Sequence, residues 1–268
     1  MNPNRQLWEK GDFTRIAATM RDSGEALVNS LGITPGLKVL DVGCGDGTTA
    51  VPAARRKADV LGVDIASNLV AAGTRRAREL GLPNLRFRQG DACDLADVAD
   101  KSFDLVVSIF GAMFAPEPMA VARAMVRVTR PGGRIVMGNW IPNDPTLAAQ
   151  ILKVSSAYSP PPPPGFVSPM RWGVERDVIE RFGSAGIAAE RISCEKDTFV
   201  FSFPGSPGEF VDTFRNHYGP TMNAFEAAEK DGRGHSLARE LTEVFAGQNT
   251  TTDGCLIPAT FLRVTVAV

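Results

Sequence analysis

The sequence is poor in the residues that most often bind metals or cross-link a chain. Among its 268 residues are only two histidines and four cysteines. Structural zinc sites and disulfide frameworks rely on closely spaced cysteine pairs. No C-x-x-C pair occurs here, because the cysteines are far apart, at Cys44, Cys93, Cys194 and Cys255. We therefore expect no metal site and no disulfide bonds.

A strong excess of charge and a long apolar run are also missing. The formal net charge is -1 and the Lys and Arg residues are dispersed, whereas proteins that bind nucleic acid usually show a clear basic excess. The longest apolar stretch, residues 103–115, contains Asp104 and Ser108 and is too short to span a bilayer. The N-terminal residues lack the apolar core of a secretory signal. These features predict no nucleic-acid partner, no membrane span and a cytoplasmic location.

One stretch organises the rest of the chain. An apolar segment at residues 39–42 leads into Gly43, Gly45 and Gly47, and a helix is expected to begin near Thr49. Glycine allows backbone N–H groups to approach a ligand closely, and a helix N-terminus favours a negative group. This strand, turn and helix therefore predict a cradle for a ligand.

The surrounding pattern predicts an α/β fold with a doubly wound parallel sheet. Strands are expected at residues 60–65, 85–89, 103–110 and 134–140, with helical segments and short connections between them. A helix is predicted over 2–31, and Ser67 is predicted to cap the helix after the second strand.

Beyond Trp140 the alternation of strands and helices stops. Helices are expected at 146–158, 174–185, 210–218 and 224–245, with a break at 231–234, and strands at 192–203 and 259–268, which could form a terminal antiparallel pair. The run Pro160 to Pro164 must be extended, and we interpret it as a stiff surface connector.

Acidic residues stand at the ends of three predicted strands. Asp41 lies just before the glycine turn, and Asp64 ends the second strand about 20 residues later, where a carboxylate can accept both ribose hydroxyls of an adenosine. Asp91 ends the third strand and would reach the adenine side of the same crevice. The dinucleotide fingerprint G-x-G-x-x-G would require glycine where Thr48 stands. The pattern therefore favours an adenosine ligand over a nicotinamide dinucleotide.

The successive segments VLDVGCGDG, GVDI, QGDA, FDLVVSIFGAMF and RPGGRIVM resemble the ordered motifs of class I S-adenosylmethionine-dependent methyltransferases. The resemblance is to the small-molecule group typified by the ubiquinone/menaquinone-biosynthesis methyltransferases, and it covers about residues 37–140. It implies a Rossmann-like, seven-stranded sheet whose last strand is antiparallel, with helical additions that form a substrate cap. It also implies S-adenosyl-L-methionine as the cofactor.

The resemblance assigns cofactor contacts to nine residues. Asp41 would support the turn, Gly43 and Gly45 would pack against the methionine part, and Asp64 with the adjacent Ile65 would bind the ribose. Asp91 and Ala92 would contact the adenine, and Ser108 and Phe110 would line the floor near the sulfonium. A Gly43→Val substitution should then block the cofactor and leave the fold largely intact.

Candidates for catalysis and acceptor binding are less well marked. Because a sulfonium methyl is already activated, catalysis mostly requires a nucleophile held in line with it, aromatic faces that stabilise the cation and, for a protonated nucleophile, a base. His217, beside Tyr218, is a candidate base, although a lone histidine on a helix is more often a packing or surface residue. Phe13, Phe114 and Trp140 are candidates for the acceptor pocket. The remaining aromatic candidates are interpreted mainly as core residues: Trp8, Phe166 and Trp172.

We interpret the chain as a single domain in three parts: an N-terminal helical cap (1–36), a cofactor-binding core (37–141) and acceptor-pocket helices with the last two strands (142–268). The predicted activity is methyl transfer by in-line displacement to an O, N or C atom of a small, fairly apolar molecule, with no metal. A homodimer is an open alternative to a monomer. Two other functions are kept: an NAD(P)-dependent oxidoreductase and a non-catalytic protein that binds S-adenosylmethionine.

Overall fold

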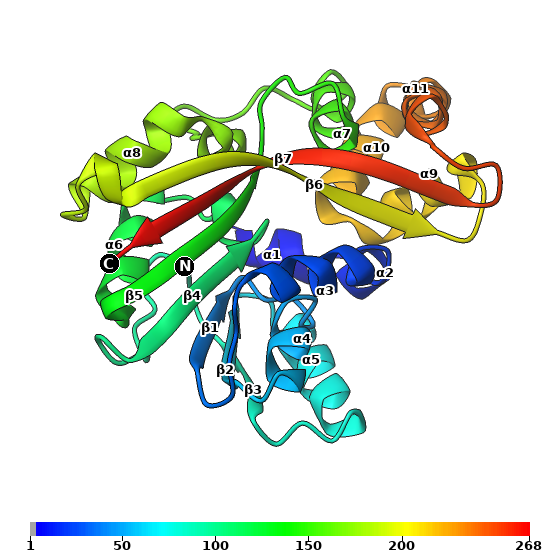
Figure 1. Ribbon diagram of the computed structural model, residues 1–268. Coiled ribbons are helices and arrows are strands. Elements are labelled where there is room, and N and C mark those ends of the chain that lie inside the picture. The colour runs from blue at the N-terminus through cyan, green and yellow to red at the C-terminus, as the bar shows by residue number, and fades with distance from the viewer. Residues whose placement is uncertain (1–3) are drawn as a thin grey trace.

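The computed structural model describes residues 4–268, and across that range the chain folds around one seven-stranded sheet (Figure 1). The spatial order is β3-β2-β1-β4-β5-β7-β6. The first five strands pair in parallel, and β7 is antiparallel to both of its neighbours. This confirms the predicted Rossmann-like sheet with an antiparallel last strand. The strands are β1 (Lys38–Val42), β2 (Asp59–Asp64), β3 (Leu85–Gln89), β4 (Phe103–Ile109), β5 (Thr129–Trp140), β6 (Ile192–Phe203) and β7 (Cys255–Ala267).

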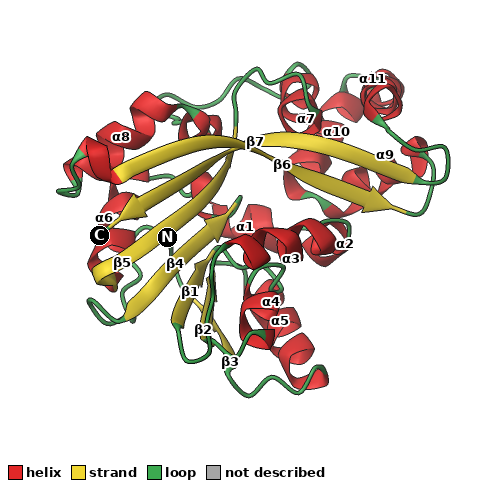
Figure 2. Ribbon diagram, viewed as in Figure 1, coloured by secondary structure: helices red, strands yellow, loops and turns green. Residues whose placement is uncertain are grey.

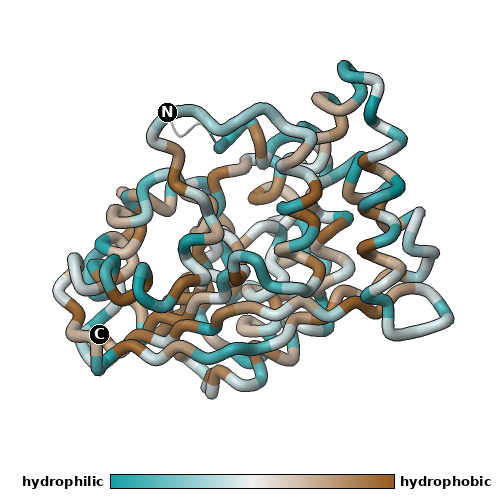
Figure 3. Tube along the Cα trace, turned by 90° about the horizontal axis from the view of Figure 1, so that it is seen from above, coloured by the Kyte–Doolittle hydropathy of each residue, from teal (hydrophilic) through white to brown (hydrophobic). Residues whose placement is uncertain are grey.

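Helices cover the sheet on both sides (Figure 2). On one side lie α3 (Arg21–Ser30), α4 (Ala50–Arg55) and α5 (Ser67–Glu79), and on the other lie α6 (Pro118–Val128) and α8 (Glu175–Ser184). Leu40 in β1 and Val106 in β4 are fully buried. Strands covered on both faces need nearly continuous apolar sequence, which explains the pattern of the central strands. Figure 3 shows apolar residues concentrated along the strands and hydrophilic ones on the outer segments.

The last two strands extend beyond the parallel strands and carry a second layer of helices (Figure 1). This roof consists of α7 (Leu147–Ser156), α9 (Pro207–His217), α10 (Gly219–Lys230) and α11 (Gly234–Gln248). Phe210 of α9 and Phe245 of α11 are fully buried, with ring centroids 5.1 Å apart. The roof lies above the carboxyl ends of the parallel strands, and its buried aromatic residues belong to the same apolar core as the central strands.

Two local predictions are wrong. The predicted helix over 2–31 is three helices, α1 (Asn4–Glu9), α2 (Phe13–Ala18) and α3, and its first two positions lie outside the described residues. Gly11 has φ +72° and the Asp12 carboxylate accepts a hydrogen bond from the backbone N–H of Thr14, so a turn and a new helix cap interrupt the pattern. Ser67 does not cap α5, because Ala66 occupies the N-cap position. The Ser67 hydroxyl instead donates to Oε1 of Glu9 at 2.7 Å.

The proline run between α7 and a short 3₁₀ helix (Pro169–Gly173) has no helix or strand assignment, in agreement with its expected role as a connector. Among residues 4–268, no helix combines the length and apolar character needed to cross a membrane. In the same range, no cluster of three or more His, Cys, Asp or Glu side chains is arranged to hold a metal ion.

Candidate functional site

A cleft with about 670 Å³ of empty space opens at the carboxyl ends of β1, β2 and β4. The strand order reverses between β1 and β4, which is where ligands bind in doubly wound sheets. The cleft brings together seven of the nine predicted cofactor residues, each from a strand end or the loop after it: Gly43, Gly45, Asp64, Ile65, Asp91, Ala92 and Phe110. Asp41 does not line the cleft itself. It lines a smaller adjoining space of about 410 Å³, here called the inner end of the cleft, which shares Gly43, Gly45 and Phe110 with it.

The glycine turn has two different requirements for glycine. Gly43 and Gly45 both have positive φ, at +70° and +54°, where residues with a Cβ are strained. A Cβ on Gly43 would lie 2.6 Å from Cα of Gly111, so glycine here allows two loops to touch. A Cβ on Gly45 would come no nearer than 3.9 Å to any neighbour, the ring of Phe13. Gly45 is therefore the position that leaves space in the cleft.

Asp64 connects the glycine turn to helix α5. Its Oδ2 accepts a hydrogen bond from the backbone N–H of Gly45 at 2.8 Å, and its Oδ1 accepts one from Ala66 at 2.9 Å. The side chain is 8% exposed, and burial raises the pKa of its carboxyl group. The carboxylate thus fixes the turn while still lining the cleft.

The inner end of the cleft contains two buried carboxylate oxygens that lack partners. Within residues 4–268, Oδ2 of Asp41 and Oδ1 of Asp46 have no hydrogen-bond partner. The two residues are only 2% and 5% exposed, and both line this end of the cleft. The other oxygen of Asp46 is paired with Arg21. Because buried carboxylate oxygens without a partner are costly, this end of the cleft suits a cationic group.

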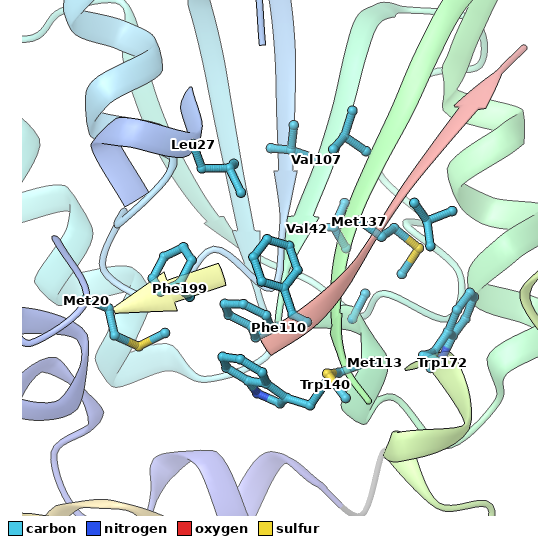
Figure 4. Close-up of a cluster of buried hydrophobic side chains, with 14 of the residues drawn as sticks. Met20, Leu27, Val42, Val107, Phe110, Met113, Met137, Trp140, Trp172 and Phe199 are labelled. Carbon is cyan, nitrogen blue, oxygen red and sulfur yellow. The ribbon is translucent and has the colours of Figure 1, made fainter. Parts of the chain in front are cut away.

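A second space, here called the inner pocket, adjoins the cleft and has about 480 Å³ of empty volume. Phe13, Phe110 and Phe114 line both spaces. Phe110 stacks on Trp140 with centroids 3.6 Å apart and an angle of 6° between the rings (Figure 4). Phe110 has φ +60°, a strained conformation for a bulky residue. The stack and an edge contact with Phe199 at 5.1 Å hold it there.

Tyr218 carries the only hydroxyl group among the described residues that line the inner pocket. Its ring lies against Trp8, Phe13 and Phe214, with centroids 5.9, 6.1 and 5.5 Å away. Burial raises the pKa of Tyr218, so the phenol stays neutral and can donate a hydrogen bond.

The structure separates His217 from Tyr218. His217 ends α9 and is half-buried, and it is absent from the described residues that line the cleft or the inner pocket. Its carbonyl group faces Gly11, where a Cβ would lie 2.9 Å from the oxygen. The structure therefore does not bring His217 into the described lining of either space, and its role as a base stays a prediction.

Ser108, which was expected near the sulfonium, is not among the described residues that line the cleft, its inner end or the inner pocket. Its hydroxyl donates to the carbonyl oxygen of Val42 at 2.7 Å and accepts from the N–H of Ala112 at 2.9 Å. Ser108 is only 1% exposed, and its hydroxyl uses both its donor and its acceptor to connect β1 to the loop after β4. Ser108 thus supports the loops that form the cleft.

Sequence reasoning expected an N-terminal helical cap but did not assign Trp8 to the site. Trp8, interpreted as core, lines both the cleft and the inner pocket, and its ring centroid lies 4.9 Å from that of Phe114. Trp172 is a core residue as expected, whereas Phe166 is 55% exposed. An aromatic residue in a leading helix was the only available signal for Trp8. Further lining residues of the inner pocket had no local signal, among them Met20, Ala148, Ile151, Phe201 and Phe214.

Comparison with known proteins agrees with this geometry. Residues 40–137 match the family described as Methyltransferase domain. An uncharacterized protein of Mycobacterium tuberculosis is 35% identical over 245 residues, which are 90% of this chain and 86% of the relative. A demethylmenaquinone methyltransferase of Beutenbergia cavernae is 40% identical over 115 residues, 43% of this chain and 45% of that protein.

Among solved structures, the YcgJ protein of Bacillus subtilis has the same fold, with a TM-score of 0.59 at 19% identity over 91% of this chain and 97% of that one. The glycine turn, the aspartates at the strand ends and the family match all point to one cofactor and one class of reaction. The chain belongs to the class I S-adenosylmethionine-dependent methyltransferases, and it is an enzyme of that class with S-adenosylmethionine as its cofactor.

Proposed function

We propose that the enzyme methylates a small, largely apolar molecule held in the inner pocket. The observation that carries this proposal is that the inner pocket shares Phe13, Phe110 and Phe114 with the cofactor cleft. No charged side chain occurs among the described residues that line the pocket. A pocket of this kind selects molecules by apolar burial and shape.

In this proposal the cofactor is held along its whole length by the cleft. Asp64 and Ile65 would bind the ribose, Asp91 and Ala92 the adenine, and Gly45 would leave room for the chain between them. The unpartnered oxygens of Asp41 and Asp46 fit the α-ammonium group of the methionine part. Asp46 would thereby add a contact that the sequence motifs did not suggest.

The bound cofactor supplies a methyl group already activated by the sulfonium. Trp8, Phe13 and Phe114 would exclude water and place aromatic faces near the positive charge. The neutral hydroxyl of Tyr218 would donate a hydrogen bond that orients the acceptor. Because this phenol is a poor base at its raised pKa, the proposed acceptor atom is one that needs no strong base, such as an amine, an electron-rich carbon or an ionised hydroxyl.

The proposal assigns residues 1–36 to covering the cleft, 37–141 to holding the cofactor and 142–268 to selecting the acceptor. A cytoplasmic location and a homodimer remain predictions.

The two rival functions, a nicotinamide-dependent oxidoreductase and a non-catalytic binding protein, are not favoured by the family match. Thr48 in place of the third glycine of the dinucleotide fingerprint also weighs against the oxidoreductase.

Blocking the inner pocket should separate acceptor binding from cofactor binding. Ala148 lines this pocket from α7, and Ala148→Phe should fill part of it. Transfer of tritiated methyl groups from S-adenosylmethionine to the apolar, solvent-extractable metabolites of a cell extract should fall about tenfold or more, while calorimetry with S-adenosylhomocysteine gives an unchanged Kd. Ala157→Phe, at the exposed end of the same helix, is the matched control. Label that appears only in water-soluble products would contradict an apolar acceptor.

The Asp41 assignment predicts a pH-dependent cofactor affinity. Burial, and secondarily the charge of Asp64, raises the pKa of Asp41 from its usual 3.8 to about 8. The folded, cofactor-free protein therefore favours the protonated form, and this contribution to stability is lost as pH rises toward about 8. A cation beside Asp41 favours the carboxylate, so binding releases a proton. The increase in Tm caused by S-adenosylhomocysteine should grow between about pH 6 and about pH 8.5. In Asp41→Asn this increase should be the same across that pH range. If the increase still depends on pH in Asp41→Asn, the proton released on binding comes from another group.

A further inference from the structure

A groove lies between α6 and α8, two helices that pack against each other on one side of the sheet (Figure 1). It has about 1260 Å³ of empty volume, open to solvent in part. Arg123 of α6, Arg171 of the 3₁₀ helix and Arg181 of α8 line it, and it is here called the arginine groove. Among the described residues, none lines both this groove and the cofactor cleft or the inner pocket. The arginine groove is therefore separate from the methyl-transfer site.

Arg181 brings a buried positive charge without a partner to this groove. The residue is only 5% exposed, and its guanidinium carbon lies 4.4 Å from the ring centre of Trp172. Within residues 4–268, Nη1 of Arg181 has no hydrogen-bond partner. Asp177, one turn earlier on α8, is instead paired with Arg171, whose Nη2 donates to Oδ1 at 2.9 Å. Burial lowers the pKa of Arg181. Because an unpaired buried charge is costly, this part of the groove favours an anion.

The first turn of α6 supplies further hydrogen-bond donors to the same groove. Glu117 occupies the N-cap position and forms no side-chain cap. Within the described residues, the backbone N–H groups of Met119 and Ala120 have no acceptor, as expected at an uncapped helix start. The hydroxyl of Ser184, one turn after Arg181, lies 3.4 Å from Sδ of Met119. The positive end of α6 is therefore adjacent to the part of α8 that carries Arg181, and both favour an anion.

The acidic side chains of the groove do not cancel this positive character. Asp177 is already paired, and Glu117 and Glu180 are exposed, so water and salt screen their charges. Arg123 is exposed and can turn toward a bound anion. Guanidinium groups and helix N–H groups together match the several oxygens of a phosphate group, whereas a carboxylate offers only two oxygens.

Apolar side chains flank the arginines. Phe166 and Val167 line the same groove and are 55% and 44% exposed. We propose that the arginine groove binds a small phosphate monoester. Its phosphate group is held by Arg181, Arg123 and the first turn of α6, and its organic part covers Phe166 and Val167. The site lies apart from the inner pocket, so it does not depend on the identity of the methyl acceptor.

The phosphate site is tested by thermal unfolding, with inorganic phosphate replacing chloride at constant ionic strength. Phosphate should raise the Tm of the wild type and of Arg78→Ala, which removes an exposed arginine of α5 on the other side of the sheet. It should raise the Tm of Arg181→Met much less, because only the general effect of the salt remains. This variant should keep its fold, since an apolar side chain replaces an unpaired buried charge. Equal protection of Arg181→Met and the wild type overturns the inference.

Calorimetry distinguishes a phosphate monoester from free phosphate. Phenyl phosphate should bind the wild type about fivefold or more tightly than inorganic phosphate, because its ring covers apolar surface. Phe166→Ala should remove most of this difference and leave the Kd of inorganic phosphate unchanged. Equal Kd values for the two probes in the wild type would indicate a site for free phosphate and overturn the monoester.

Arg123→Ala changes an exposed residue, so it tests the site without disturbing the buried stack on Trp172. The Kd values of both probes should rise about fivefold, because one charge-assisted hydrogen bond to the phosphate is lost. Unchanged binding of both probes in Arg123→Ala would place the phosphate elsewhere and overturn the inference.

Discussion

Asp64→Ala is expected to weaken the binding of S-adenosylhomocysteine by about a hundredfold, measured by isothermal titration calorimetry. The substitution removes the proposed acceptor of the ribose hydroxyls and leaves the N–H groups of Gly45 and Ala66 without their bonds at 2.8 and 2.9 Å. Hydrogen bonds to a charged group contribute about 1.5–3 kcal/mol each. The loss of one such bond to the ligand, together with a less ordered turn, accounts for a change of this size.

The matched control is Asp59→Ala, at the opposite end of the same strand. Asp59 forms a surface ion pair with Arg86 at 2.9 Å, and both side chains are largely exposed. Because exposed ion pairs contribute little, this variant should bind S-adenosylhomocysteine like the wild type. An Asp64→Ala protein that folds and retains normal affinity would remove Asp64 from the cofactor site.

Gly43→Val should destabilise the whole fold, with a fall in Tm of about 10 °C in a thermal unfolding experiment. A residue with a Cβ at positive φ costs about 1–2 kcal/mol, and forcing atoms into a packed site costs about 1–3 kcal/mol more. At Gly43 the forced contact is with the backbone of Gly111, 2.6 Å from the added Cβ, and backbone cannot rotate away. We therefore expect a larger loss of stability than the sequence alone suggested for this variant.

The variant Gly81→Val separates the free-energy cost of a Cβ at positive φ from the cost of the contact with Gly111. Gly81 has φ +64°, close to the +70° of Gly43, and a Cβ there meets nothing within 4 Å. The Tm of this variant should fall only because of the strained backbone conformation, by less than half of the fall expected for Gly43→Val. If the two variants unfold at the same temperature, the contact between Gly43 and Gly111 contributes nothing to stability.

The parts of the site that follow strand ends could be predicted from sequence. In a parallel sheet the carboxyl ends of strands meet at one edge, so Asp64 at the end of β2 and Asp91 just after β3 come together by topology alone. Ile65 and Ala92 lie in the cleft because they are adjacent to these aspartates. Short sequence motifs were therefore enough to predict the part of the site that lines the cofactor cleft.

The acceptor half depends on how separate elements pack, which local patterns do not encode. His217 and Tyr218 are adjacent in sequence, but Tyr218 is already the C-cap of α9 and has left the helical path. Only its side chain enters the pocket. Likewise, Ser108 and Phe110 were assigned together, yet the left-handed backbone at Phe110 sends the two side chains to different surroundings.

The continuity of β6 and β7 has a consequence for how molecules enter and leave. The same two strands form the edge of the sheet and the frame of the helical roof, with paired residues from Ile192 and Val266 to Phe203 and Cys255. Rotation of two bodies about a hinge needs a flexible connection between them, and a pair of strands bonded along its whole length provides none. The bonded pair therefore restrains rotation of the roof against the parallel strands, and we expect molecules to enter and leave through local motion of smaller elements.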